Sequence, residues 1–327
     1  MEHWLPLLFA AVCGLALLMY VVLDGYDLGV GLLLPLADDD EKDRMIASIG
    51  PFWDANETWI VLGVGVLLIA FPAAHGIILT SLYLPSTLML MGLVLRGIAF
   101  DFRVKAGDEQ KRTWNAVFSL GSLIAALCQG WMLGSYITGL GDTALNLLFA
   151  LLTALSLPAL YVMLGAVWLL CKTDGTLPKK ARRWALRGWI PLGFALLVIS
   201  LATPLVSDGI AHKWFALPQL LWVSPIPLVA AACYLWSGLA LSGRIKGRPA
   251  AIFGALAIMC LMSAAGLGYS LYPDIIPGRL RIVDAAAAPE SLLFTLWGVL
   301  LTVPFILGYT VFVYRIFSGR GIQQQYD

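Results

Sequence analysis

Long apolar stretches separated by short charged breaks dominate the chain. A helix needs roughly 20 apolar residues to cross the hydrocarbon core of a bilayer, and the pattern predicts about nine such helices. Their approximate limits are residues 5–36, 56–73, 77–100, 115–138, 145–171, 188–206, 219–242, 250–272 and 291–317. We therefore expect an all-α polytopic membrane protein. Because no internal repeat or low-complexity linker is evident, residues 1–327 are expected to form a single integral membrane domain.

Three connections carry patterns of their own. A tight turn around Pro72 and His75 is predicted between the second and third stretches, which favours an antiparallel helix pair. Residues 38–49 are polar and then amphipathic, which is typical of a segment at the membrane interface. Residues 272–290 form a weakly hydrophobic loop with three prolines, and we expect this loop to fold over the opposite membrane surface.

Positive charge falls almost entirely on one side of the predicted topology. The breaks after the odd-numbered stretches, together with the C-terminal tail, hold 17 of the 21 Lys and Arg residues. The other breaks hold Lys213, Arg279 and Arg281, and Arg96 lies inside a stretch. Because Lys and Arg accumulate in cytoplasmic loops, we expect the N-terminus outside and the C-terminus in the cytoplasm. A net charge of +1 gives no indication of a nucleic-acid partner.

Two aspartates interrupt the first apolar stretch, in the run Asp24-Gly25-Tyr26-Asp27-Leu28-Gly29-Val30-Gly31. A carboxylate at membrane depth is costly and usually faces the protein interior or a water-filled path. The spacing of three residues places both carboxylates on one helix face, and the glycines allow a close helix contact. The pair is interpreted either as a turn or cap at the cytoplasmic end of the helix or as a proton or ion site.

The second stretch begins with Pro51-Phe52-Trp53-Asp54-Ala55-Asn56-Glu57-Thr58-Trp59. This run is typical of an interfacial tryptophan belt with a helix cap. It is equally consistent with a proton entry point whose indole rings pack on a flat ring such as a quinone.

Arg96 lies inside the third stretch and is followed by Asp101 and Arg103. Arginine keeps its proton in proteins and rarely faces lipid. Arg96 is therefore expected either to pair with an acidic group on the first or second helix or to extend to the nearby cytoplasmic surface. Three consecutive helices thus bring charge to one level of the membrane.

Ligands for redox metals are not evident in the sequence. The three histidines are His3, His75 and His212, none of them predicted in mid-helix, and the five cysteines form no CxxC pair or zinc spacing. No phosphate-binding or dinucleotide-binding motif is present. If the chain serves a redox enzyme, we expect the metals on another subunit.

The three charged runs, in this order and spacing, resemble subunit II of cytochrome bd-type quinol oxidase, and the short loops resemble its cyanide-insensitive branch. The resemblance implies a complex of the bacterial inner membrane that oxidises quinol and reduces dioxygen to water. It implies a heterodimer in which subunit I carries two b-type haems and haem d. Subunit II would be a similarly folded, pseudo-symmetric partner that ligates no haem or metal. Quinone, lipids and a small single-span subunit are further partners that the resemblance implies, and some members hold a structural quinone.

The motifs and the resemblance together supply the candidate site residues. Arg96 is the expected charge partner, Trp53 and Trp59 are the quinone-binding candidates, and the proton-path candidates are Asp24, Asp27, Asp54, Glu57 and Asp101. Two other functions remain open at this point. A proton-coupled transporter also explains buried acids, although the sequence shows no inverted repeat. A purely structural membrane scaffold would use the charges for assembly alone.

Overall fold

The computed structural model describes residues 4–206, 208–215, 217–317 and 319, and in this part of the chain nine membrane-length apolar helices are found. The all-α prediction is confirmed. The nine are α1 (Trp4–Leu33, continued by the 3₁₀ turn Leu34–Leu36), α3 (Trp53–Ala70), α5 (Tyr83–Lys105), α6 (Asp108–Ile137), α7 (Ala144–Lys172), α8 (Leu177–Val206), α10 with α11 (Gln219–Val223 and Pro225–Leu241), α12 (Pro249–Leu271) and α14 (Pro289–Ile316).

Shorter elements connect these helices. The amphipathic segment predicted at 38–49 is a helix, α2 (Asp39–Ile49), whose apolar face is buried. The proline-containing loop at 272–290 forms a small antiparallel hairpin and one helical turn. The remaining connecting elements are α4 (Pro72–Ser81), α9 (Asp208–Phe215), β1 (Asp274–Ile276), β2 (Leu280–Arg281) and α13 (Ile282–Ala285).

Several predicted boundaries differ from those in the structure. The tight turn around Pro72 and His75 is instead the helix α4, and the third span begins at Tyr83 rather than at residue 77. Proline suits the first turn of a helix because its fixed φ is helical and its missing N–H needs no partner there. The helix α8 begins at Leu177 rather than at residue 188, because it continues beyond the apolar stretch into the basic segment before it.

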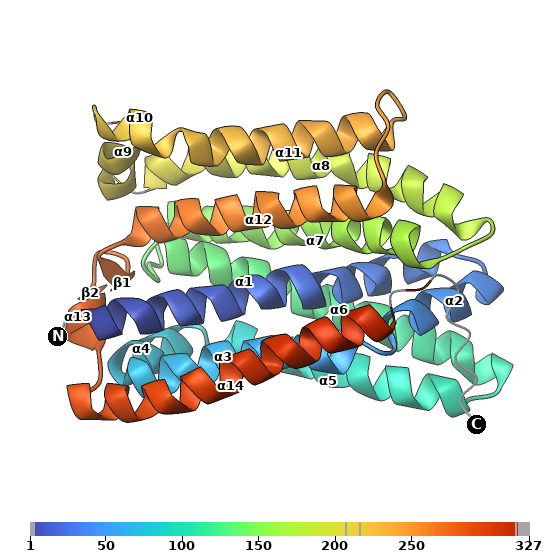
Figure 1. Cartoon of the computed structure of the whole chain (residues 1–327), viewed down its shortest axis with the longest axis horizontal. Coiled ribbons are helices and arrows are strands. Elements are labelled where there is room, and N and C mark those ends of the chain that lie inside the picture. Colours follow the sequence, from blue (N-terminus) through green and yellow to red (C-terminus); the bar gives the residue numbers. More distant parts are fainter. Residues whose placement is uncertain (1–3, 207, 216, 318, 320–327) are drawn as a thin grey trace.

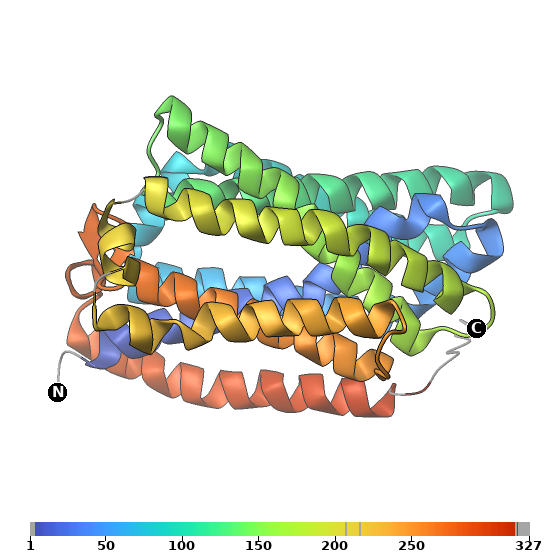
Figure 2. The same cartoon turned by 90° about the horizontal axis from the view of Figure 1, so that it is seen from above.

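The helix α1 occupies the centre of the bundle. It packs against α3, α6, α7 and α12. Figures 1 and 2 show the long helices lying side by side along the long axis of the molecule. Polar side chains on α1 therefore face protein on several sides.

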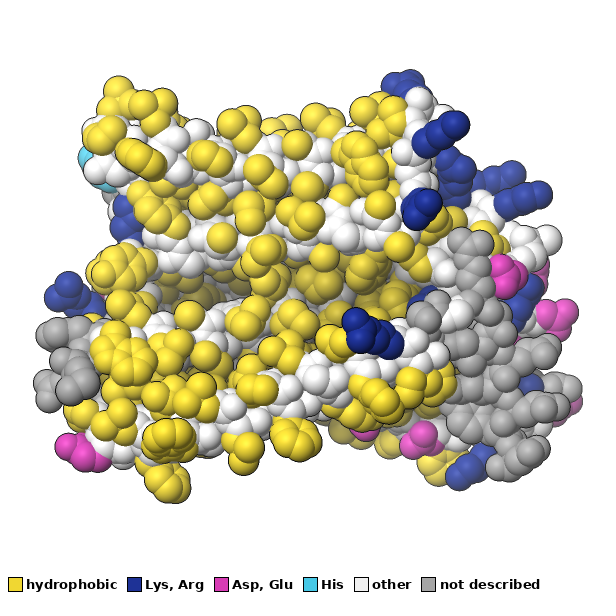
Figure 3. All heavy atoms as spheres, in the orientation of Figure 1, with side chains coloured by type: hydrophobic (Ala, Val, Ile, Leu, Met, Phe, Trp, Pro, Cys, Tyr) yellow, Lys and Arg dark blue, Asp and Glu magenta, His cyan; other side chains and the backbone are white. Residues whose placement is uncertain are grey.

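The two ends of the bundle differ in charge. Most Lys and Arg side chains gather at one end, which Figure 3 shows on its right. We call this the basic end; it contains α2 and the connections at residues 105–108, 172–177 and 242–249. The hairpin, α4, α9, α10 and α13 lie at the opposite end. Between the two ends, large hydrophobic side chains cover the surface of the bundle, as expected for helices that face lipid or another subunit.

Glycines bring α1 and α7 into backbone contact. A Cβ added to Gly29 would overlap the carbonyl oxygen of Tyr161, and one added to Gly165 would lie 2.5 Å from the carbonyl carbon of Gly29. Real side chains do not approach so closely, so both positions need glycine. This contact holds the aspartate-bearing part of α1 firmly inside the bundle.

Candidate functional site

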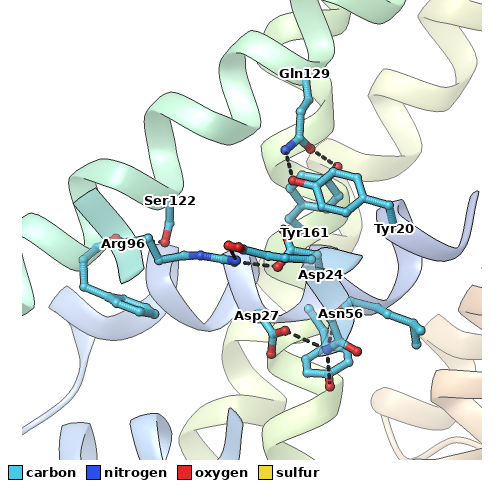
Figure 4. Close-up of polar contacts among 12 residues, drawn as sticks. Tyr20, Asp24, Asp27, Asn56, Arg96, Ser122, Gln129 and Tyr161 are labelled. Carbon is cyan, nitrogen blue, oxygen red and sulfur yellow. Dashed lines mark hydrogen bonds and ion pairs between the residues drawn. The ribbon is translucent and has the colours of Figure 1, made fainter. Parts of the chain in front are cut away.

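A buried guanidinium joins the first three spans. Arg96 on α5 places Nη1 2.7 Å from Oδ1 of Asp24 on α1, and its Nη2 donates to Oε1 of Glu57 on α3. Arg96 is 1% exposed and Asp24 is fully buried, whereas the Glu57 side chain keeps 27% of its surface exposed. Figure 4 shows the Arg96 side chain directed at Asp24. The charge pairing expected for Arg96 is thus present, with one acid from each of the two preceding spans.

Asp27 lies one turn further along α1 and is also fully buried. Its Oδ2 accepts a hydrogen bond of 2.8 Å from Nδ2 of Asn56 on α3, as Figure 4 shows. Its Oδ1 has no hydrogen-bond partner within the described residues. The carboxyl group is therefore only half satisfied, which is costly in a protein interior.

Two tyrosines and Asn56 form a closed ring of hydrogen bonds beside Asp27. The Asn56 amide nitrogen lies 2.8 Å from the Tyr26 hydroxyl, which lies 2.7 Å from the Tyr314 hydroxyl on α14. The Tyr314 hydroxyl donates in turn to Oδ1 of Asn56 over 3.3 Å. The ring fixes the Asn56 amide between the carboxylate and the two hydroxyls.

A second polar group lies on the other side of Asp24. The Tyr161 hydroxyl on α7 donates to Oε1 of Gln129 on α6 over 2.5 Å, and Nε2 of Gln129 donates to the Tyr20 hydroxyl over 2.8 Å. Tyr20 precedes Asp24 by one turn of α1, so the two side chains lie on the same face of that helix. All three side chains are buried, and Figure 4 shows the two tyrosine hydroxyl groups beside the Gln129 amide. The polar cluster thus extends from Glu57 into the interior of the bundle.

Two of the predicted acids lie outside this cluster. Asp54 is exposed in the first turn of α3, one turn before Glu57, and Asp101 is exposed towards the end of α5. In the part of the chain that the structure describes, neither carboxylate contacts Arg96, Asp24 or Asp27. The structure therefore brings together Asp24, Asp27, Glu57 and Arg96, and leaves Asp54 and Asp101 at the surface near the basic end.

The two candidate indoles have different surroundings. The Trp53 ring is partly exposed, lies 5.1 Å from the Phe100 ring and has Cζ of Arg96 6.0 Å from its centre. Trp59 is 1% exposed, so its ring has almost no surface for a ligand. Neither indole lines the pocket of about 230 Å³ between α3 and α14, which is formed by Ala55, Thr58, Phe305, Ile306, Tyr309 and Thr310.

Several cluster residues were not identified from the sequence. Asn56 stands inside a run that was interpreted as containing a helix cap, and its bond to Asp27 was not anticipated. Tyr20, Gln129, Tyr161 and Tyr314 lie singly in apolar stretches, and only their pairing across four helices marks them. Gln129 gives the clearest signal, because an amide in a membrane span needs a buried partner.

The fold and the site define a polytopic membrane subunit with three carboxylates gathered around one buried guanidinium. Among the described residues, no group of three or more His, Cys, Asp or Glu side chains is arranged to hold a metal ion. The chain belongs to the family of cytochrome bd terminal oxidase subunit II, whose profile matches residues 5–317.

Individual relatives support this assignment over nearly the whole chain. Cytochrome bd ubiquinol oxidase subunit 2 of Bacillus subtilis is 25% identical over 321 residues, which cover 92% of each chain. Cytochrome bd-I ubiquinol oxidase subunit 2 of Escherichia coli is 27% identical over 361 residues, covering 94% of this chain and 92% of that protein. A chain in the structure of bd oxidase from Geobacillus thermodenitrificans shares the fold with a TM-score of 0.78 at 17% identity, covering 96% of this chain and 98% of that one.

Proposed function

We propose that this chain is the haem-free second subunit of a quinol-oxidising, dioxygen-reducing complex and that its buried charge cluster carries protons from the cytoplasm. In this proposal a similarly folded subunit I pairs with it pseudo-symmetrically and holds two b-type haems and haem d. Those haems would supply the electron transfer and dioxygen chemistry. This chain would supply structural support and part of the proton supply.

One observation carries the proposal: two carboxylates contact one buried guanidinium, a third lies one helical turn away, and one of the contacting pair reaches the surface. Glu57 is partly exposed and contacts Arg96, which contacts the fully buried Asp24. Three ionised carboxylates with a single cation would leave uncompensated charge in the interior, which is strongly unfavourable. The cluster therefore favours binding a proton, and Glu57 gives that proton access from outside.

The direction of transfer follows from the charge distribution. We propose that the basic end faces the cytoplasm, as the Lys and Arg tally predicts. Glu57 and the exposed Asp54 lie in the first turns of α3, at that end. Protons for dioxygen reduction would then come from the cytoplasm, while quinol releases its protons on the other side. Such an arrangement separates charge across the membrane without a pump.

Substitutions of Glu57 and Asp27 in the intact complex test the proton path. We expect Glu57→Gln and Asp27→Asn to slow oxidase turnover on the order of 10²-fold, the scale of a lost proton-transfer group, at unchanged haem content. Asp54→Asn should also slow turnover if this exposed carboxylate collects protons for Glu57. Glu109→Gln removes an exposed acid near the basic end of α6 and serves as the control.

Normal turnover in both Glu57→Gln and Asp27→Asn would exclude the proton path. It would instead favour a scaffold in which the charges only assemble the complex. A reduced-minus-oxidised spectrum of the complex purified through a tag on this chain tests the oxidase assignment separately. We expect b-type and d-type bands together with a larger co-purifying subunit.

A further inference from the structure

Asp24 and Asp27 are both fully buried on one face of α1, yet their surroundings differ in charge. Asp24 contacts the Arg96 guanidinium at 2.7 Å. Asp27 accepts one hydrogen bond from a neutral amide, and no ion pair to its carboxylate is found among the described residues. A negative charge is therefore better stabilised on Asp24 than on Asp27.

The hydrogen bonds among Tyr161, Gln129 and Tyr20 share one direction, with each residue donating to the next. Tyr161 gives its hydroxyl proton to Gln129, and the Gln129 amide nitrogen gives a proton to the oxygen of Tyr20. Because the Tyr20 oxygen accepts that bond, its own proton is not used by Gln129, and Tyr20 lies one turn before Asp24 on the same face of α1. A Tyr20 hydroxyl proton turned towards Asp24 would stabilise the ionised form of that carboxyl group.

The two tyrosine hydroxyl groups near Asp27 donate to partners other than its carboxylate. In the ring with Asn56, the Tyr26 proton is directed to Tyr314 and the Tyr314 proton to the Asn56 oxygen. Neither hydroxyl proton is then available to Asp27. The Asn56 amide is its single donor among the described residues.

The charged groups near Asp27 come from three elements. They are Asp24 on α1, Glu57 on α3 and Arg96 on α5, and the tyrosines Tyr26 on α1 and Tyr314 on α14 complete the titratable surroundings. The two acids repel a negative charge on Asp27. The one cation is already in contact with both of those acids.

We propose that Asp24 is the permanently ionised counter-ion of Arg96, positioned by the chain Tyr161–Gln129–Tyr20, and that Asp27 is the carboxyl that holds the transferable proton. The transfer itself rests on the proposed function, whereas the protonation states do not. Tyr20, Gln129 and Tyr161 are positioning residues, because they act through Asp24. Proton movement through the cluster then needs only one carboxyl to change its charge.

Infrared difference spectroscopy of the intact complex tests the assignment, since a protonated carboxyl group has a C=O band separate from that of a carboxylate. We expect Asp27→Asn to remove a buried protonated-carboxyl band that the unsubstituted complex shows. Persistence of every such band in Asp27→Asn would overturn the proposal. Asp24→Asn is unsuitable as the main test, because it leaves the buried Arg96 short of a counter-charge.

The positioning chain is tested by removing one hydroxyl group. In Tyr20→Phe the Asp24 carboxylate loses a donor, and we expect an additional protonated-carboxyl band and a displaced pH profile of turnover. Tyr161→Phe should have a weaker effect in the same direction. Tyr234→Phe is the matched control, since its hydroxyl donates to the Trp189 carbonyl on another helix pair. Identical spectra for Tyr20→Phe and Tyr234→Phe would overturn the positioning role.

The outcomes separate this inference from the proposed function. Normal turnover in Asp27→Asn together with a lost band would leave the protonation states intact and remove the proton path. Slow turnover in Asp27→Asn with the band unchanged would support the path but overturn the assignment of the proton to Asp27.

Discussion

Nη1 of Arg96 and Oδ1 of Asp24 lie 2.7 Å apart in the interior, with 1% and 0% of their side-chain surfaces exposed. At this depth each charge needs the other, because neither has water to replace it. The pair links the third span to the first, and through Glu57 to the second. The Arg96–Asp24 pair therefore holds these helices together and is also part of the proposed proton site.

Removing one partner of the Arg96–Asp24 pair should destabilise the protein more than replacing both partners with apolar residues. Arg96→Met leaves Asp24 buried without its cation, and we expect a loss of about 3–5 kcal/mol in stability. The double variant Arg96→Met with Asp24→Leu should recover part of that loss, because no unpaired aspartate then remains at this contact. Thermal unfolding of the purified complex measures both effects. Strictly additive losses in the double variant would show that the two side chains do not interact.

The glycine contact between α1 and α7 should tolerate no side chain. In Gly165→Ala the added methyl group would press against the backbone of Gly29, and we expect a loss of about 1–3 kcal/mol from overpacking. Gly254→Ala on α12 is the control, because its Cβ would enter open space. Helix propensity predicts for the control a gain of up to about 1 kcal/mol. Equal melting temperatures for the two variants would contradict the close approach.

A polar contact at the basic end should make stability depend on pH. Burial alone would raise the pKa of Glu41, but bonds from Lys180, the Asp38 backbone N–H and the Thr176 hydroxyl hold it below the usual 4.5. The folded state thus favours the ionised form. Its contribution is fully present above pH 4.5 and is lost as the pH falls through the lowered pKa.

Glu41→Gln should remove this contribution. The melting temperature of the variant should lie below that of the unsubstituted chain near neutral pH, and the difference should shrink as the pH falls below 4.5. Glu109→Gln, which changes an exposed acid, should show no such convergence. A difference for Glu41→Gln that stays constant with pH would contradict the expected titration.

The amount of quinone that co-purifies with the complex should depend more on Trp53 than on other tryptophans. Trp53→Leu removes a partly exposed ring near Arg96, and we expect less quinone to co-purify. Trp297→Leu on α14 removes an indole that is 74% exposed and serves as the control. Extraction and chromatography of the quinone from each variant give the comparison. Unchanged quinone content in Trp53→Leu would exclude contact with this indole.

The sequence by itself determined the helical class, the number of spans and the presence of acids within the first span that must face inward. Those features depend on local composition: apolar length defines a span, and a charge within a span cannot face lipid at low cost. The same rule gave two expectations for Arg96, an acid on the first or second helix or the cytoplasmic surface, and the structure shows the first. The glycines around Asp24 and Asp27 likewise indicated a close helix contact.

The tertiary structure alone decided which polar groups meet. The contacts of Tyr20 with Gln129, and of Gln129 with Tyr161, join α1, α6 and α7 and leave no local pattern in the sequence. Asp54 and Asp27 could not be distinguished as exposed and buried, because exposure depends on which helices pack beside each one. The helix α4 was missed for a related reason, since its apolar residues continue the pattern of the neighbouring span. Composition determines whether a segment enters the membrane, whereas helix packing determines what each polar side chain touches there.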